Sequence, residues 1–264
     1  MNSHKNYKER TTTSLNYYKI FDEKKDYNFI IITLVLLISL IILFIEKEGK
    51  IYGKIVIISM LVSTIFIYNE LKKHYKNKEI FILLISVTIG TPIIAILISF
   101  ILKIISKGKV DTGLNSFAAL LGVIIISFIY SKKIKTNPER IIDSYINVVP
   151  LIYSIGKIGC FIVGCCYGIK YSGPFAIVYH NSLDAPNNTK LFPIQIIESL
   201  VFLLIFIYSN KNKKTYLTII NCGICKFFLD FLRYRNENEL ITLNQILSIV
   251  SIISGIYIKK RKIR

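Results

Sequence analysis

The sequence predicts an all-α fold, a polytopic bundle of about eight transmembrane helices. Hydrophobic residues make up 53% of the 264 residues and charged residues only 19%, whereas a soluble domain normally carries about 25% charged residues. The mean hydropathy of +0.52 excludes a disordered chain. The apolar residues form long charge-free runs, and Lys and Arg lie almost wholly between them. That distribution is typical of a membrane protein.

The expected spans follow one another along most of the chain. They cover residues 28–45, 51–68, 80–102, 112–131, 144–168, 191–208, 215–232 and 240–258. Each run is longer than an ordinary strand and lacks the alternation of an outer-membrane barrel. Helices then remain as the structure that can satisfy the hydrogen bonds of the backbone inside lipid. We expect a polar tail over 1–27, one membrane domain over 28–258 and a basic tail over 259–264.

The basic residues orient this bundle. Both tails together with the connections 70–79, 132–140 and 210–214 hold 22 Lys and Arg, whereas the connections 46–54, 103–111, 169–190 and 233–239 hold 10. By the positive-inside bias, the first set is cytoplasmic, and so both termini are expected inside the cell. The same reasoning explains the net charge of +18 without a nucleic-acid partner.

Several spans carry polar side chains that cost free energy inside a membrane. In the predicted orientation these side chains fall in one layer near the outer leaflet. They are Asn115, Lys157, Gln195, Glu198, Lys226, Asp230, Arg233 and Gln245. One interpretation is a structural network of interhelical pairs, and the other is a binding or catalytic site. The charged members carry one positive charge in excess, which favours a bound anion such as a lipid phosphate.

Three cysteines lie in the glycine-rich stretch 156–168: Cys160, Cys165 and Cys166. They are interpreted as small buried hydrophobes, as a nucleophilic thiol, as a disulfide on the oxidising side of the membrane, or as metal ligands. Cys222 and Cys225 form a C-x-x-C on a deeper part of another span. Because this pair lies deeper than the other three cysteines, we expect no bound metal, and we expect no cofactor.

Five short blocks resemble the prolipoprotein diacylglyceryl transferase family, in the family's order, over roughly residues 110–260. Residues 156–168 read GKIGCFIVGCCYG and are similar to the family signature G-R-I-G-N-F-x-N-G-E-x-x-G. Residues 117–122, 192–198, 226–233 and 244–248 resemble the family's blocks H-G-G-L-x-G, H-P-x-Q-L-Y-E, R-x-x-x-E-F-F-R and G-Q-x-L-S. The resemblance implies a core of seven helices, to which the first span here adds one.

The chain departs from the family pattern at chemically important positions. The signature arginine, asparagine and glutamate are replaced by Lys157, Cys160 and Cys165. The arginine of the third block is Lys226, and the histidine is Phe117. Lysine binds phosphate as a point charge and lacks the fork of arginine, and losing the histidine removes an obvious general base.

The resemblance implies a transferase that moves a diacylglyceryl group from phosphatidylglycerol to a cysteine thiol of a prolipoprotein or similar acceptor. Lys157, Lys226 and Arg233 would hold the phosphate, and Glu198 or Asp230 would orient them or accept a proton. The substrate would also contact Asn115, Gln195 and Gln245, and the three cysteines would act on the acceptor side or as a carrier nucleophile.

The expected partners are therefore an anionic phospholipid and a lipoprotein precursor, and not nucleic acid. The expected location is a bacterial plasma membrane, crossed several times, with the site towards the outer leaflet. The alternative is a non-catalytic membrane protein that binds a lipid or a partner on a degenerate transferase fold. The missing histidine and arginine favour this alternative.

Overall fold

The computed structural model describes residues 51–105, 116–182, 184–234 and 241–263, and this part of the chain is mostly helical. Its helices, in chain order, are α2 (Ile51–Leu71), α3 (Asn77–Ile105), α4 (Ser116–Lys133), α5 (Pro138–Ile146), α6 (Val149–Val163), α7 (Ile194–Asn212), α8 (Thr215–Leu229), the 3-10 helix η1 (Asp230–Leu232) and α9 (Leu243–Ile263). The strands β1 (Ile177–Val178) and β2 (Lys190–Leu191) pair antiparallel.

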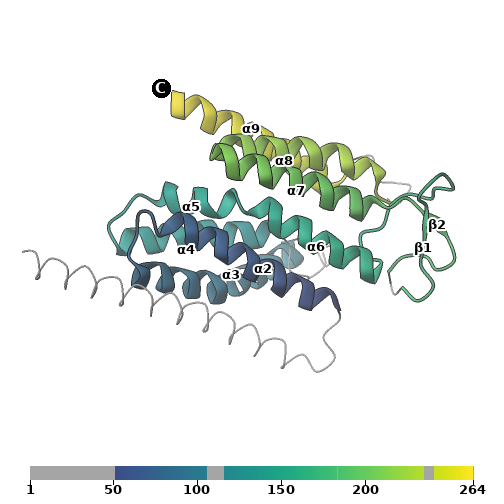
Figure 1. Cartoon of the computed structure of the whole chain (residues 1–264), viewed down its shortest axis with the longest axis horizontal. Coiled ribbons are helices and arrows are strands. Elements are labelled where there is room, and N and C mark those ends of the chain that lie inside the picture. Colours follow the sequence, from purple (N-terminus) through teal and green to yellow (C-terminus); the bar gives the residue numbers. More distant parts are fainter. Residues whose placement is uncertain (1–50, 106–115, 183, 235–240, 264) are drawn as a thin grey trace, which may run out of the picture.

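The helices run along the long axis of the bundle, and the two strands lie beyond one end of it (Figure 1). Helices α8 and α9 pack together on one side, and α3 and α4 on the other. Helix α6 contacts both α2 and α7 and so joins the two sides. We call the end that carries the strands the site end and the opposite end the basic end.

The structure confirms the predicted all-α, polytopic membrane fold. Five stretches among the described residues are long and apolar enough to cross a membrane: Ile51–Leu71, Asn77–Ile98, Pro138–Val163, Ile194–Asn212 and Thr215–Leu232. The first expected span, 28–45, lies outside the described residues. The total of eight spans therefore stays a prediction.

Several expected boundaries differ from the structure by a few residues, and two spans show the physical reasons. The span predicted over 144–168 is formed by α5 and α6, which begin at Pro138 and end at Val163. Pro138 starts α5 because a proline suits the first turn of a helix. The span predicted from 191 starts as a helix only at Ile194, because the chain before Pro193 pairs as β2.

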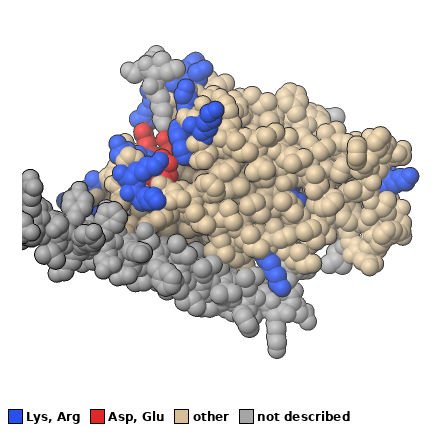
Figure 2. Space-filling model, viewed as in Figure 1, with Lys and Arg blue, Asp and Glu red and all other residues tan. Residues whose placement is uncertain are grey.

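On the face shown in Figure 2 the middle of the bundle carries few charged side chains, and charged side chains gather at its basic end. Large hydrophobic side chains such as Phe100, Leu204 and Ile253 are exposed on the helices. Outward apolar faces are favourable when the surrounding solvent is lipid. The connections after α2, α4 and α7 meet at the basic end, where Lys213 pairs with Glu70 at 3.0 Å.

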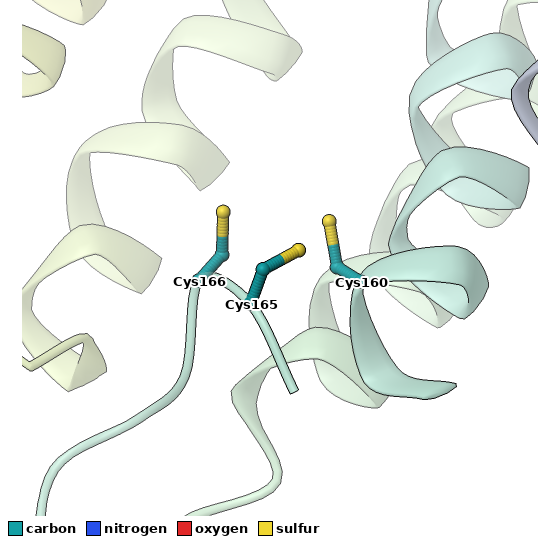
Figure 3. A group of neighbouring side chains, drawn as sticks. All are labelled: Cys160, Cys165 and Cys166. Carbon is teal, nitrogen blue, oxygen red and sulfur yellow. The ribbon is translucent and has the colours of Figure 1, made fainter. Parts of the chain in front are cut away.

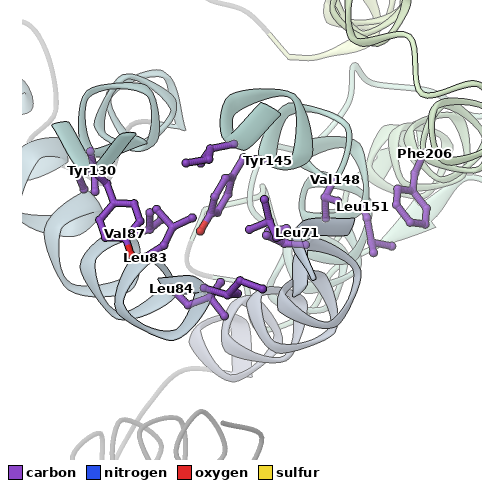
Figure 4. Packing of buried hydrophobic residues seen from close by; sticks show 13 residues of the cluster. Leu71, Leu83, Leu84, Val87, Tyr130, Tyr145, Val148, Leu151 and Phe206 are labelled. Atoms are coloured by element: carbon purple, nitrogen blue, oxygen red, sulfur yellow. The ribbon is translucent and has the colours of Figure 1, made fainter. Parts of the chain in front are cut away.

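The buried hydrophobic core joins α2 to α7 through side chains that interdigitate between the helices (Figure 4). Leu71, Leu83, Tyr145 and Phe206 are among its members. Tyr130 from α4 donates a hydrogen bond of 2.6 Å to the carbonyl of Glu79 in α3. This core holds α6 and α7 in fixed positions, and these two helices carry much of the candidate site.

Candidate active site

The candidate site is centred on Glu198 of α7, whose side chain is fully buried. Lys157 from α6 and Arg233 from the segment after η1 each lie 2.8 Å from its Oε2 atom. Lys226 from α8 lies 2.8 Å from Oε1. Three cations from three different elements therefore meet on one buried carboxylate. The structure thus brings together the charged residues Lys157, Glu198, Lys226 and Arg233 that the sequence placed in one layer.

Tyr153 completes this group, which we call the Glu198 cluster (Tyr153, Lys157, Glu198, Lys226 and Arg233). Its hydroxyl donates to Glu198 Oε1 at 3.1 Å and accepts from Lys226 Nζ and from Arg233 Nη2. The ammonium groups of Lys157 and Lys226 each lie 5.1 Å from the centre of its ring. No sequence pattern singles out Tyr153, although it stands four residues before Lys157 on the same helical face.

The position of α6 against α7 sets the geometry of the cluster. Ser154 donates a hydrogen bond of 2.8 Å to the carbonyl of Ser199, next to Glu198. The bond is buried, so it ties the two helices together at the depth of the ion pairs. Gln195 stands one helical turn before Glu198 and faces the same region.

The Glu198 cluster carries more positive charge than its own carboxylate neutralises. Three cations against one carboxylate leave two positive charges within the described cluster. Seven buried side-chain atoms of the described residues have no hydrogen-bond partner, and two of them, Arg233 Nε and Gln195 Oε1, belong to the cluster or stand beside it. Buried polar atoms are nearly always paired, so these two atoms have unused capacity for a ligand that carries acceptors and donors.

Asp230 belongs to a neighbouring group at the start of α9. It is buried and accepts hydrogen bonds from the Thr242 hydroxyl and from Asn244 Nδ2, the latter at 3.3 Å. Gln245 is also buried there, and its Oε1 accepts a hydrogen bond from the backbone of Thr242. These contacts fasten η1 to α9 and so hold the segment that carries Arg233.

The three cysteines of the glycine-rich stretch lie together where α6 ends (Figure 3). Cys160 is on the last turn of α6, and Cys165 and Cys166 follow the helix end. Gly164 ends the helix with a left-handed φ of 80°. Cys166 is also left-handed, with a φ of 53°, which is uncommon outside glycine. The two turns bring the Sγ atoms of all three cysteines within 4.8 Å of one another.

Gln195 connects the cysteine turn to α7. Its Nε2 atom donates to the carbonyl of Cys165 at 3.0 Å and lies 3.4 Å from the Tyr179 hydroxyl. Tyr179 donates in turn to the carbonyl of Phe161 at 2.9 Å. Burial raises the pKa of Tyr179 to about 12. The pKa of Cys166 lies below its usual range, because it is hydrogen-bonded to Cys160 and Cys165 and has Lys157 and Arg233 nearby.

Gly168 fixes Arg233 beside the cluster. It forms an antiparallel bridge with Arg233, and Ile169 donates to the carbonyl of Leu232 at 3.1 Å. On its other side, a Cβ atom at Gly168 would stand 2.3 Å from the carbonyl oxygen of Phe192. The segment passes between the start of α7 and the end of η1 with no room for a side chain.

The remaining candidate residues lie elsewhere. Asn115 lies outside the described residues. Cys222 and Cys225 are on α8, and both are partly buried. His180 bonds to Asn188 in the loop, with 2.9 Å between its Nδ1 and the amide oxygen.

The long apolar helices and the buried, positively charged cluster define a polytopic membrane protein with a polar centre at one end. The model of the prolipoprotein diacylglyceryl transferase family matches residues 39–259. The chain therefore belongs to this family.

Individual relatives agree with this assignment. The chain is 30% identical over 227 residues to the phosphatidylglycerol–prolipoprotein diacylglyceryl transferase of Clostridium tetani, which covers 78% of this chain and 90% of the relative. It is 28% identical over 230 residues to the phosphatidylglycerol–prolipoprotein diacylglyceryl transferase 2 of Clostridium perfringens. This match covers 78% of this chain and 88% of the relative. A shorter match, 32% over 98 residues, is to the transferase of Dehalococcoides mccartyi, with 37% and 38% covered.

Proposed function

We propose that this protein transfers the diacylglyceryl group of phosphatidylglycerol to a cysteine thiol of a lipoprotein precursor. Two relatives that carry this description are matched over 90% and 88% of their length. The observation in this chain that supports the proposal most directly is the Glu198 cluster. It gathers three cations around one carboxylate in the buried part of a membrane protein.

The cations of the cluster suit the phosphate of the donor lipid. Lys157, Lys226 and Arg233 would bind its oxygens, and the unpaired Nε of Arg233 supplies a further donor. Charged hydrogen bonds of this kind are the strong ones, and arginine can bind phosphate through two of its nitrogens. Glu198 would hold the three cations in place when no lipid is bound, which keeps their mutual repulsion from opening the site.

The reaction forms one bond and breaks one. The acceptor sulfur bonds to the diacylglyceryl carbon that carries the phosphate, and the bond from that carbon to the phosphate oxygen breaks. Glycerol phosphate leaves with the bonding electrons, so cations beside its oxygens stabilise the charge that develops in the transition state. The proton of the acceptor thiol leaves before or during the attack.

We further propose that the cluster faces the outer leaflet. The loop that carries the strands lies at the site end, opposite to the lysine-rich connections (Figures 1 and 2). If those connections are cytoplasmic, as the positive-inside bias predicts, the site end is on the outer side. An acceptor exported across the membrane would reach it from there.

The proposal is tested by lipid transfer in membranes from cells that produce each variant. The donor is phosphatidylglycerol with labelled acyl chains, and the product is a labelled thioether on a cysteine-containing prolipoprotein. Lys157→Ala should lower the transfer rate at least about 100-fold, because it removes a cation from the transition state. Lys213→Ala is the matched control, since Lys213 makes its ion pair with Glu70 at the basic end, and it should leave the rate unchanged.

Two outcomes would contradict the proposal. Absence of transfer by the wild-type protein, with labelled lipid still bound, would favour the non-catalytic lipid-binding alternative. Equal transfer by wild type and Lys157→Ala, at matched amounts of folded protein, would remove the cluster from the reaction.

A further inference from the structure

The cysteine turn brings three thiols together beside the Glu198 cluster. Cys160 is buried, Cys165 is partly buried and Cys166 is exposed. Their sulfur atoms lie within 4.8 Å of one another, and no other group of three possible metal-ligating side chains occurs among the described residues. Cys222 and Cys225 do not join the group. Spacing alone did not predict this convergence, because the left-handed turns at Gly164 and Cys166 create it.

The sulfur positions are close to those of a zinc site. Zinc–sulfur bonds of about 2.3 Å in tetrahedral geometry place the sulfurs about 3.8 Å apart. The spread of at most 4.8 Å closes to that value by a movement of about 1 Å, which side-chain rotation alone can supply. Three protein ligands leave the fourth position of the ion free, as in catalytic zinc sites. The exposed side of Cys166 is where that position would open.

The surroundings of the turn favour a bound thiolate group. A zinc ion held by three thiolates carries one net negative charge. Two cations lie beside the turn: Lys157 stands three residues before Cys160 on α6, and Arg233 is bridged to Gly168, two residues after Cys166. Gln195 holds the carbonyl of Cys165 from α7, so the ligand backbone is fixed by a buried partner. Such support outside the ligands themselves is common in metal sites.

The proposed transfer requires a deprotonated acceptor thiol, and the buried carboxylates Glu198 and Asp230 already accept hydrogen bonds. Both carboxylate oxygens of Glu198 accept from cations, and Asp230 accepts from Thr242 and Asn244. His180 is bonded to Asn188 in the loop. A metal ion removes this difficulty because a thiol that coordinates it is deprotonated.

We propose that Cys160, Cys165 and Cys166 bind one zinc ion, whose fourth position binds the acceptor thiol as a thiolate. The zinc-binding part stands by itself, and the acceptor part rests on the proposed function. On coordination the acceptor thiol releases its proton to water. Its sulfur then attacks the diacylglyceryl carbon, glycerol phosphate leaves, and the thioether, a neutral and weaker ligand, dissociates. The zinc ion keeps its charge and its three cysteine ligands throughout.

The first test is metal content. The protein is purified in detergent under a non-thiol reductant, with any histidine tag removed, and its zinc is measured by mass spectrometry. We expect about one zinc per wild-type chain. Cys160→Ser and Cys165→Ser should each lose at least about tenfold in bound zinc. Cys222→Ser and Cys225→Ser are matched controls on α8 and should keep it. Size-exclusion profiles establish that each variant is folded.

The second test concerns the fourth position and uses cobalt in place of zinc. Three thiolates and an exchangeable ligand predict intense sulfur-to-cobalt charge-transfer bands and the visible bands of tetrahedral cobalt. A short peptide with one cysteine should shift the visible bands, and the same peptide with serine should not. Neither the zinc content nor the cobalt spectrum depends on lipid transfer.

The outcomes separate this inference from the proposed function. A wild-type protein that transfers lipid but binds zinc no better than Cys160→Ser would overturn the zinc site and leave the function intact. A disulfide among the three cysteines in the unreduced protein, with no zinc after reduction, would overturn it as well. Zinc binding without any response to the cysteine peptide would overturn the acceptor part. Bound zinc in a protein without transfer activity would count against the proposed function alone.

Discussion

The two ends of the bundle bury polar side chains in different ways. At the site end, Glu198 meets three cations. At the basic end, the buried polar side chains are neutral: Thr218 bonds to Asn147 and to Ser209, each at 2.8 Å, and Asn147 donates to Thr215 at 3.3 Å. The ion pairs of the basic end, such as that of Glu70 with Lys213, are partly exposed.

This difference favours a structural role for the buried network at the basic end and a binding role for the Glu198 cluster. The neutral network at Asn147 links the junction of α5 and α6 to α7 and α8, and its groups satisfy one another, as expected of an interhelical contact in a membrane. The Glu198 cluster retains excess positive charge and the unpaired Nε of Arg233, and the Oε1 of Gln195 one helical turn before Glu198 is also unpaired. Buried charge without full compensation is costly, so its presence at the site end supports the proposed binding of a lipid phosphate.

The largest expected effect concerns the side of the membrane on which each end of the bundle lies. A reporter gives an all-or-none answer for each position. A reporter fused after Arg264, and another after Lys135, should report the cytoplasm, while one inserted within residues 182–189 should report the outside. The reason is the excess of Lys and Arg in the connections of the basic end. A cytoplasmic signal from the 182–189 insertion would place both ends on the wrong sides and remove the outer-leaflet assignment.

The next effect compares two glutamates, one at each end. Glu198→Gln leaves three buried cations without their counter-charge and should lower the free energy of unfolding by about 3–5 kcal/mol. Glu70→Gln breaks only partly exposed ion pairs and should cost under about 1 kcal/mol. Reversible unfolding of both variants in the same detergent measures the difference. Equal costs would mean that the Glu198 cluster is not buried as described.

A smaller effect is expected in the neutral network. Thr218→Val keeps the shape of the side chain but leaves the Asn147 amide oxygen without its partner, which should cost about 1–3 kcal/mol of stability. Lipid transfer per folded molecule should be unchanged, because the network lies at the other end of the bundle. A transfer rate that falls with Thr218→Val beyond the loss of folded protein would show that the two ends are coupled.

The sequence predicts the convergence of Lys157, Glu198, Lys226 and Arg233, because charges inside apolar runs are conspicuous and helix direction fixes their depth. It does not single out Tyr153, since a tyrosine within an apolar helix is an ordinary residue. The sequence places Asp230 at the same depth as the start of the last span, but it does not predict which side chains bond to it. Thr242 and Asn244 reach Asp230 through the packing of η1 against α9.

Helix ends were the least predictable feature, for a local physical reason. The hydropathy of residues 144–168 continues past Val163, but the left-handed backbone of Gly164 ends α6 there. Apolar character cannot distinguish this turn from one more helical turn. Hydropathy predicts that α6 continues past all three cysteines. In the structure Cys165 and Cys166 instead leave the helix and turn back towards Cys160.

The Glu198 cluster is proposed to bind the phosphate of an anionic lipid. The most direct measurement is the thermal stability of the purified protein with added phosphatidylglycerol and with added zwitterionic phospholipid. We expect phosphatidylglycerol to raise the melting temperature by about 5 °C more, through binding to the folded state. Lys157→Gln and Arg233→Gln should abolish the difference while the protein stays folded, and Lys213→Gln should preserve it. Equal stabilisation of the wild type by both lipids would contradict the account and leave the cluster as a purely structural network.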